Sequence, residues 1–160
     1  MGQATTGTGR ALEEPNDTPH SMINPDRLTV KSNEALNEAL GLARKNGNPL
    51  VYDLHLLHAL LAQDEGIVGP ILQKLGVNLA GLREGIDREM ARYPRQSGAQ
   101  PTLSREMNGV VGRAEEEARG LGDDYVSTEH LLLALADTKG TESKALLSAA
   151  GIERKALLDD

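Results

Sequence analysis

The sequence predicts an all-α fold made of two tandem four-helix repeats related by a pseudo-twofold axis. Three observations support it: the second half of the chain repeats the first, apolar residues recur every three or four positions in both halves, and no segment alternates apolar and polar residues over the length of a strand. With 160 residues and 39% hydrophobic content, the chain is large enough to bury a sizeable core.

The repeat is found by aligning the chain with itself at an offset of 75 residues, without a gap. This relates residues 28–85 to residues 103–160, and 15 of these 58 positions are identical. Identity of this extent, dominated by apolar residues, indicates two copies of one structural unit.

The chain therefore divides into four segments. Residues 1–25 are rich in Gly, Thr, Pro, Asn and Asp and are predicted to be a disordered leader. Repeat one covers residues 26–92, and repeat two covers residues 103–160. Between them, residues 93–102 contain two Pro and one Gly, a composition typical of a linker. Residues 26–160 are thus expected to form the folded domain.

Each repeat is expected to contain four helices in the same order. The first helices are long and end at Gly47 and Gly122, because glycine readily adopts the left-handed conformation that ends a helix. The second helices, at 54–61 and 131–136, are apolar on nearly every side and are predicted to be central. The short third helices end at Gly76 and Gly151, and the fourth helices begin near Asn78 and Glu153.

Composition excludes several main functions. Three Tyr, no Phe and no Trp leave few rings for stacking single-stranded nucleic acid, and the net charge of −7 disfavours binding to a phosphate backbone. There is no Cys for a disulfide or a thiolate metal site, and no apolar run near the roughly 20 residues of a membrane span. We expect a cytoplasmic protein with a basic or amphipathic partner, not nucleic acid or membrane.

Two histidines could in principle form a metal site. His55 and His58 lie three residues apart, with Asp53 nearby, a spacing that a small helical metal enzyme could use. Only His55 has a counterpart in repeat two, His130, because His58 and Asp53 align with Leu and Thr. We therefore interpret the shared histidine as part of the architecture of the repeat, and a metal enzyme remains an alternative.

Acidic residues gather in repeat two. Ser127-Thr128-Glu129-His130 precedes three leucines and has the pattern of a helix start, with a Ser cap and an acid in the first turn. A helix start that is exposed in a groove can also bind a group of a partner molecule. Residues 115–117 are three consecutive glutamates, which we assign to a solvated helix face. With 12 acidic and 7 basic residues over 101–160, any preference for basic peptides belongs to repeat two.

These features resemble the Clp repeat domain, the N-terminal module of the Clp AAA+ ATPases. The resemblance covers residues 26–160, and residues 122–129 together with the ten-residue linker are most similar to ClpB-type disaggregases. It is carried by Glu-His-Leu-Leu-Leu-Ala-Leu at 129–135, His-Leu-Leu-His-Ala-Leu-Leu at 55–61, the Leu28-Thr29 start, and Leu75-Gly76-Val77 matched by Ala150-Gly151-Ile152.

The resemblance implies a mobile domain that captures unfolded or aggregated polypeptides for a hexameric ATPase ring. Walker A and other enzyme motifs are missing from this sequence, so we expect a monomeric binding module, not an enzyme, with no cofactor of its own and with ATP used by the parent protein. The implied partners are those polypeptides, the AAA+ ring of the parent and, through the parent, Hsp70-type co-chaperones. The alternative is a free-standing Clp-repeat adapter or regulator, which the downstream gene sequence would reveal.

The resemblance also implies a set of substrate-binding residues around an apolar groove in repeat two. Arg113 stands at a position that is apolar in the family. ClpC relatives bind phosphoarginine through one Glu in each repeat, and we do not expect this paired site because repeat one has Leu54 there. The implied substrate-binding residues are Thr29, Val110, Val111, Asp123, Glu129 and His130.

Overall fold

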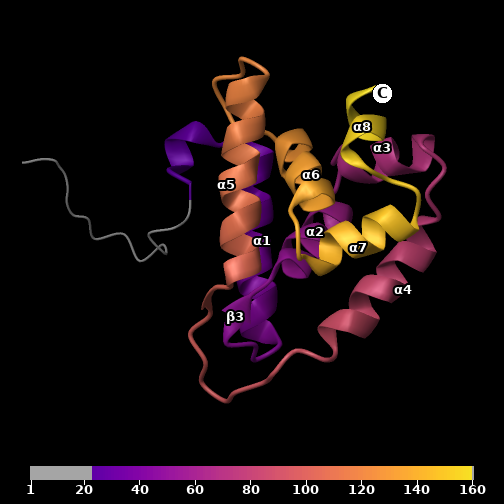
Figure 1. The fold of residues 1–160 in the computed structure, drawn as a ribbon. Coiled ribbons are helices and arrows are strands. Elements are labelled where there is room, and N and C mark those ends of the chain that lie inside the picture. Colours follow the sequence, from indigo (N-terminus) through magenta and orange to yellow (C-terminus); the bar gives the residue numbers. More distant parts are fainter. Residues whose placement is uncertain (1–22, 160) are drawn as a thin grey trace, which may run out of the picture.

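The computed structural model describes residues 23–159, and in this part of the chain eight α-helices dominate (Figure 1). The all-α expectation is therefore confirmed; residues 1–22 of the expected leader lie outside the described residues. In chain order the elements are a 3₁₀ turn (Pro25–Arg27), α1 (Val30–Lys45), β3 (Leu50–Val51), α2 (Asp53–Ala62), α3 (Val68–Lys74), α4 (Leu79–Met90), β4 (Thr102–Leu103), α5 (Arg105–Gly120), α6 (Thr128–Asp137), α7 (Glu142–Ala149) and α8 (Arg154–Leu158).

Two short backbone pairings join the repeats. Strand β3 pairs in parallel with β4, which sets Val51 opposite Leu103, and an isolated bridge sets Leu28 opposite Val126. The offset of 75 residues converts one pair into the other, so the same contact is made twice with the repeats exchanged. This is the relation expected of a pseudo-twofold axis. Sequence periodicity gave no sign of these pairings because each strand has only two residues.

The long first helices of the two repeats begin and end alike. Thr29 caps α1 by accepting the Ser32 N–H (3.2 Å), and Ser104 caps α5 by accepting the Met107 N–H (2.9 Å). Just past the other end, the equivalent glycines Gly47 and Gly122 have φ of 70° and 76°, a region that a side chain disfavours. The predicted helix ends are confirmed.

Helices α2 and α6 occupy the centre, as their uniformly apolar sequences predict. Nearly all of their residues are buried, and side chains of the other helices pack around them in one continuous core. None of the helices in residues 23–159 is both long and apolar enough to cross a membrane. The largest fully buried side chains are Leu36, Leu54, Leu56, Leu57, Leu60, Leu72, Ile86, Met107, Leu131, Leu132, Leu135 and Leu147.

One buried carboxylate links the repeats. Asp53, in the first turn of α2, accepts the backbone N–H of Ser143 at the start of α7 over 2.7 Å. Burial raises the pKa of Asp53, and the hydrogen bond from Ser143 partly opposes that rise. The carboxylate therefore fastens repeat one to the positive end of a helix in repeat two.

Two local expectations are corrected. Ile23 lies in the segment expected to be disordered, but its side chain is buried in the core. Glu117 was assigned to a solvated face with Glu115 and Glu116, yet it is buried, because the i, i+4 stripe that runs from Arg113 faces α6 and α8 rather than solvent.

Candidate functional site

A histidine and an aspartate form the polar centre of the candidate site in repeat two. His130, at the third position of α6, accepts the backbone N–H of Ser127 through Nδ1 (2.8 Å). The ring proton is therefore on Nε2, which donates to Asp123 Oδ2 (2.8 Å). The imidazole is buried, whereas the aspartate side chain is 51% exposed. The buried imidazole thus orients the carboxylate of Asp123 at the protein surface.

This carboxylate lies on the rim of a hollow of about 330 Å³ between α3, α6 and α8, here called the groove. Its apolar lining includes Leu121 and Leu158, which are 51% and 40% exposed, two of the five large hydrophobic side chains that are exposed in residues 23–159. The acidic rim consists of Asp123 and Glu129. The full lining is Ile71, Leu121, Asp123, Glu129, His130, Leu132, Leu133, Leu157 and Leu158.

Repeat one holds the equivalent pair in a closed environment. His55 accepts the Tyr52 N–H through Nδ1 (2.9 Å), and its Nε2 donates to Asn48 Oδ1 (2.9 Å). Asn48 is the counterpart of Asp123 and is only 1% exposed. Burial, together with the neighbouring His58, lowers the pKa of His55 to about 4. This imidazole therefore stays neutral at physiological pH.

The linker closes this site. Tyr93 and Pro94, here called the strap, follow α4 where the chain turns toward β4 and α5 (Figure 1). The Tyr93 ring stacks on Tyr52 with centroids 3.9 Å apart, and the Pro94 carbonyl accepts a hydrogen bond from Asn48 Nδ2 (3.0 Å). The strap lies over the His–Asn pair of repeat one, while the His–Asp pair of repeat two borders an open groove.

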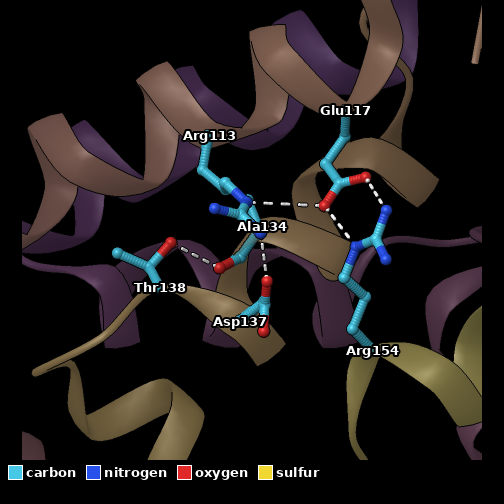
Figure 2. Close-up of polar contacts among 6 residues, drawn as sticks. All are labelled: Arg113, Glu117, Ala134, Asp137, Thr138 and Arg154. Carbon is cyan, nitrogen blue, oxygen red and sulfur yellow. Dashed lines mark hydrogen bonds and ion pairs between the residues drawn. The ribbon is translucent and has the colours of Figure 1, made fainter. Parts of the chain in front are cut away.

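Helix α8, one wall of the groove, is fixed by an ion pair to α5 (Figure 2). Arg154 at the start of α8 binds both oxygens of the buried Glu117, at 2.6 and 2.9 Å. The hydrogen bond from Arg154 is the main cause that lowers the pKa of Glu117. Arg113 bridges Glu117 (3.5 Å) and Asp137. Arg113 therefore serves to tie α5 to α6, and it does not line the groove.

The structure brings together three of the six residues that the resemblance implied. Asp123, Glu129 and His130 line the groove. Thr29 caps α1 instead, and its backbone N–H donates to Val126 O (3.1 Å), which ties it to the loop that carries Asp123.

The expectation that Val110 and Val111 line a groove is corrected. Both are buried in the core, because they belong to the inward stripe of α5 that packs against α6. Sequence reasoning missed the surface-accessible apolar residues of the groove, which are Ile71, Leu121, Leu157 and Leu158. Leu121 gave no separate signal, because in the sequence it continues the apolar stripe of α5, and Ile71 comes from the other repeat.

The metal-enzyme alternative gains no support from the geometry. Both ring nitrogens of His55 are used in hydrogen bonds, and His58 Nε2 lies 3.9 Å from Asp87 Oδ1. Within residues 23–159 there is no group of three or more His, Cys, Asp or Glu side chains that could hold a metal ion.

Comparison with known proteins gives a consistent result. The family model "Clp repeat (R) N-terminal domain" matches residues 27–150. The chaperone protein ClpB of Bacteroides thetaiotaomicron is 37% identical over 135 residues, which cover 84% of this chain and 16% of that protein. The chain thus spans about a sixth of the length of such relatives.

Solved structures show the same fold. The Hsp104 N-terminal domain from Candida albicans superposes with a TM-score of 0.72 at 20% identity, over 81% of this chain and 85% of that chain. A ClpV N-domain, solved in complex with a VipB peptide, superposes with a TM-score of 0.66 at 20% identity, over 87% and 94% of the two chains.

Proposed function

Because the chain belongs to the Clp repeat (R) N-terminal domain family, and matches the N-terminal part of ClpB chaperones, we propose that it binds apolar segments of unfolded or aggregated polypeptides in the groove of repeat two. The observation that carries this proposal is the groove itself. Its apolar walls are open to solvent, and Asp123 on its rim is oriented by a buried histidine, whereas the same place in repeat one is covered by the strap.

The exposed apolar surface extends beyond the groove. Tyr125 and Val30 are also exposed, and each is one residue from the Thr29–Val126 hydrogen bond that joins the repeats. Exposed apolar residues next to an apolar hollow are typical of interaction surfaces. This arrangement supports a role for Thr29 at the edge of the binding surface.

The size of the groove is suited to weak binding. A hollow of about 330 Å³ takes one or two apolar side chains, and burying each stabilises the complex by roughly 1.5–3 kcal/mol. Association costs of at least about 4 kcal/mol offset much of this gain. Binding would then be weak and tolerant of sequence, which suits a domain that passes polypeptides onward.

The activity of the parent protein is part of the proposal. We propose that the chain is a non-enzymatic module of a cytoplasmic ClpB-type disaggregase, whose AAA+ ring uses ATP and cooperates with Hsp70-type partners. The chain itself is expected to be monomeric. The ClpV N-domain bound to a VipB peptide supports peptide binding by this fold.

The test is a titration of the labelled 160-residue chain with an unfolded casein fragment, followed by amide chemical shifts. We expect shifts in residues 121–130 and in α8. Leu121→Asp should weaken binding about tenfold, the loss of roughly one buried leucine. Ala80→Asp, at an exposed apolar residue of α4 outside the groove lining, is the matched control and should change affinity less than twofold. Equal losses in both variants, or shifts centred on residues 48–58, would refute the assignment.

A further inference from the structure

A second hollow of the molecule lies where the linker packs on the end of α1. It has a volume of about 460 Å³, and among the described residues it is lined by three cations and no acid. The cations are Arg44 and Lys45 of α1 and Arg95 of the linker, and the hollow is here called the basic cleft. None of its lining residues also lines the groove. Figure 1 shows the linker and β3 at one end of the molecule and α8, a wall of the groove, near the other.

The three cations of the basic cleft are not neutralised within the described part of the chain. Arg44, Lys45 and Arg95 are all exposed, and none of them belongs to an ion pair in residues 23–159. The whole chain has 24 acidic and 17 basic residues, so most of its surface charge is negative. The basic cleft is therefore a place of concentrated positive charge on an acidic protein, which attracts anionic groups.

The end of α1 does not by itself require this much positive charge. A cation in the last turn of a helix interacts favourably with the helix dipole, and Arg44 and its equivalent Arg119 both have this position. In α5 Arg119 is the one cation of the last turn, because Gly120 replaces Lys45. Arg95 belongs to no helix. The helix end thus accounts for one of the three cations, and Lys45 and Arg95 are additional.

Hydrogen bonds hold the two sides of the basic cleft together. The Gln96 N–H donates to the Gly47 carbonyl (2.8 Å), and Asn48 Nδ2 donates to the Pro94 carbonyl (3.0 Å). The Gly47 N–H donates to the Arg44 carbonyl (3.0 Å), so this acceptor, which would repel an anion, already has a donor. The backbone positions of the cations on α1 and on the linker are therefore fixed relative to each other.

We propose that the basic cleft binds an acidic polypeptide segment of a partner protein, on a surface separate from the groove. An extended segment places alternate side chains on one side, about 7 Å apart, so several carboxylates reach one cleft. A single small anion would leave most of the cleft unfilled, and three cations are few for a nucleic acid interface of about 6–10 phosphate contacts. The polar side chains of Asn46, Gln96 and Ser97 are available to the main chain of the segment.

The experiment titrates the labelled 160-residue chain with two capped peptides and follows amide chemical shifts. One peptide has three glutamates that alternate with glycines, and the other has glutamines in their place. In low salt the glutamate peptide should bind about tenfold more tightly, because three exposed ion pairs contribute about twofold each. At about 0.5 M salt this preference should fall below about threefold. The shifts should lie in residues 44–47 and 95–99.

Arg44→Gln and Arg119→Gln form a matched pair of variants, because each removes a cation from the last turn of a long helix. Arg44→Gln should weaken binding of the glutamate peptide about twofold, and Arg119→Gln, which lies outside the basic cleft, should leave it unchanged. Arg95→Gln, in the linker, should also weaken it about twofold. The double variant of Arg44 and Arg95 should reduce the preference for glutamate to about twofold. Thermal melting of all variants verifies that they are folded.

Three results would overturn the proposal: equal binding of the two peptides by the parent chain, an undiminished preference for glutamate in the double variant, or shifts outside the basic cleft. Inorganic phosphate that produces the same saturable shifts, at the concentration of the peptide carboxylates, would assign the cleft to small anions instead. Shifts that depend on protein concentration without peptide would assign it to a second copy of the chain. Each of these two reassignments also contradicts the proposal, and neither depends on whether the groove binds the casein fragment.

Discussion

His55 and His130 have the same helix position, the same main-chain partner through Nδ1 and an Asx partner through Nε2, yet they differ in what lies above them. The strap covers the Asx residue of repeat one, where Asn48 is 1% exposed. The Asx residue of repeat two, Asp123, is half exposed at an open groove.

The difference shows that one structural unit can hold its Asx residue in two different environments. In both repeats the histidine is an architectural residue that closes a helix start and orients its Asx partner. The Asx residue differs between the repeats. Asn48 has an amide N–H that can donate to the carbonyl of the strap, whereas Asp123 has a carboxylate that can only accept from a donor. Within residues 23–159, the Asx residue of repeat one is thus hydrogen-bonded to the strap, and the Asx residue of repeat two is half exposed.

The largest effect is expected from exchanging the Asx residues. Asn48→Asp should destabilise the fold by about 3 kcal/mol, because it buries a carboxylate against the Pro94 carbonyl and removes a donor. Asp123→Asn should change the free energy of unfolding by about 0.5 kcal/mol or less, since that site is solvated. Urea denaturation of both variants at pH 7 measures the two values, and similar values would remove the contrast between the sites.

Removing the ring of Tyr93 should destabilise the fold less than Asn48→Asp does, and it should uncover the His–Asn pair of repeat one. Tyr93→Ala loses the stacking on Tyr52 and the hydrogen bond to Glu142, with an expected destabilisation of about 2 kcal/mol. In this variant the casein fragment should also shift amides around His55. If no new shifts appear in repeat one although the variant remains folded, the strap does not mask a binding surface.

Protonation of His55 should make the stability of the fold depend on pH. Since the pKa of His55 is lowered to about 4 in the folded state, only the unfolded state takes up this proton between its ordinary value near 6.5 and pH 4. Stability therefore falls as pH falls through this window, by about 1 kcal/mol from pH 7 to pH 5.5. His55→Gln should lose this part of the pH dependence, and His130→Gln should keep it. Urea denaturation of both variants at pH 7 and pH 5.5 measures the difference.

The smallest effect concerns the wall of the groove. Glu117→Gln weakens the ion pair to Arg154 and should make α8 more mobile. We expect the free energy of unfolding to fall by about 0.5 kcal/mol and the affinity for the casein fragment to fall about twofold. Glu116→Gln, on the exposed side of α5, is the control and should change neither. A loss of affinity in the control alone would mean that surface charge, and not the position of α8, governs binding.

Much of the fold could be predicted from sequence because it is local. The glycines at helix ends and the apolar sequences of α2 and α6 are features of single elements, and the ungapped repeat can be found by comparing the chain with itself. The structure has the helices where these patterns placed them. Ile23 and Glu117 were misplaced because their burial depends on contacts with distant elements. An acidic run such as residues 115–117 gives no sign that one member meets Arg154.

The site was predicted only in part, for the same reason. Asp123, Glu129 and His130 belong to one continuous segment that starts α6, so their proximity follows from the chain. The apolar walls come from three separate helices, so no continuous segment predicts them. The resemblance placed Val110 and Val111 at the groove, although both belong to the inward apolar stripe of α5. Their burial means that Val111→Asp would test stability and not binding.

The most direct test of the central claim uses leucine methyl resonances as matched reporters in the two repeats. Leu132 and Leu157 line the groove, and Leu57 and Leu82 are their equivalents in repeat one. In a titration with the unfolded casein fragment, we predict saturable shifts for Leu132 and Leu157 and unchanged positions for Leu57 and Leu82. Equal shifts in both pairs, or shifts confined to Leu57 and Leu82, would contradict the claim that repeat two is open and repeat one is closed.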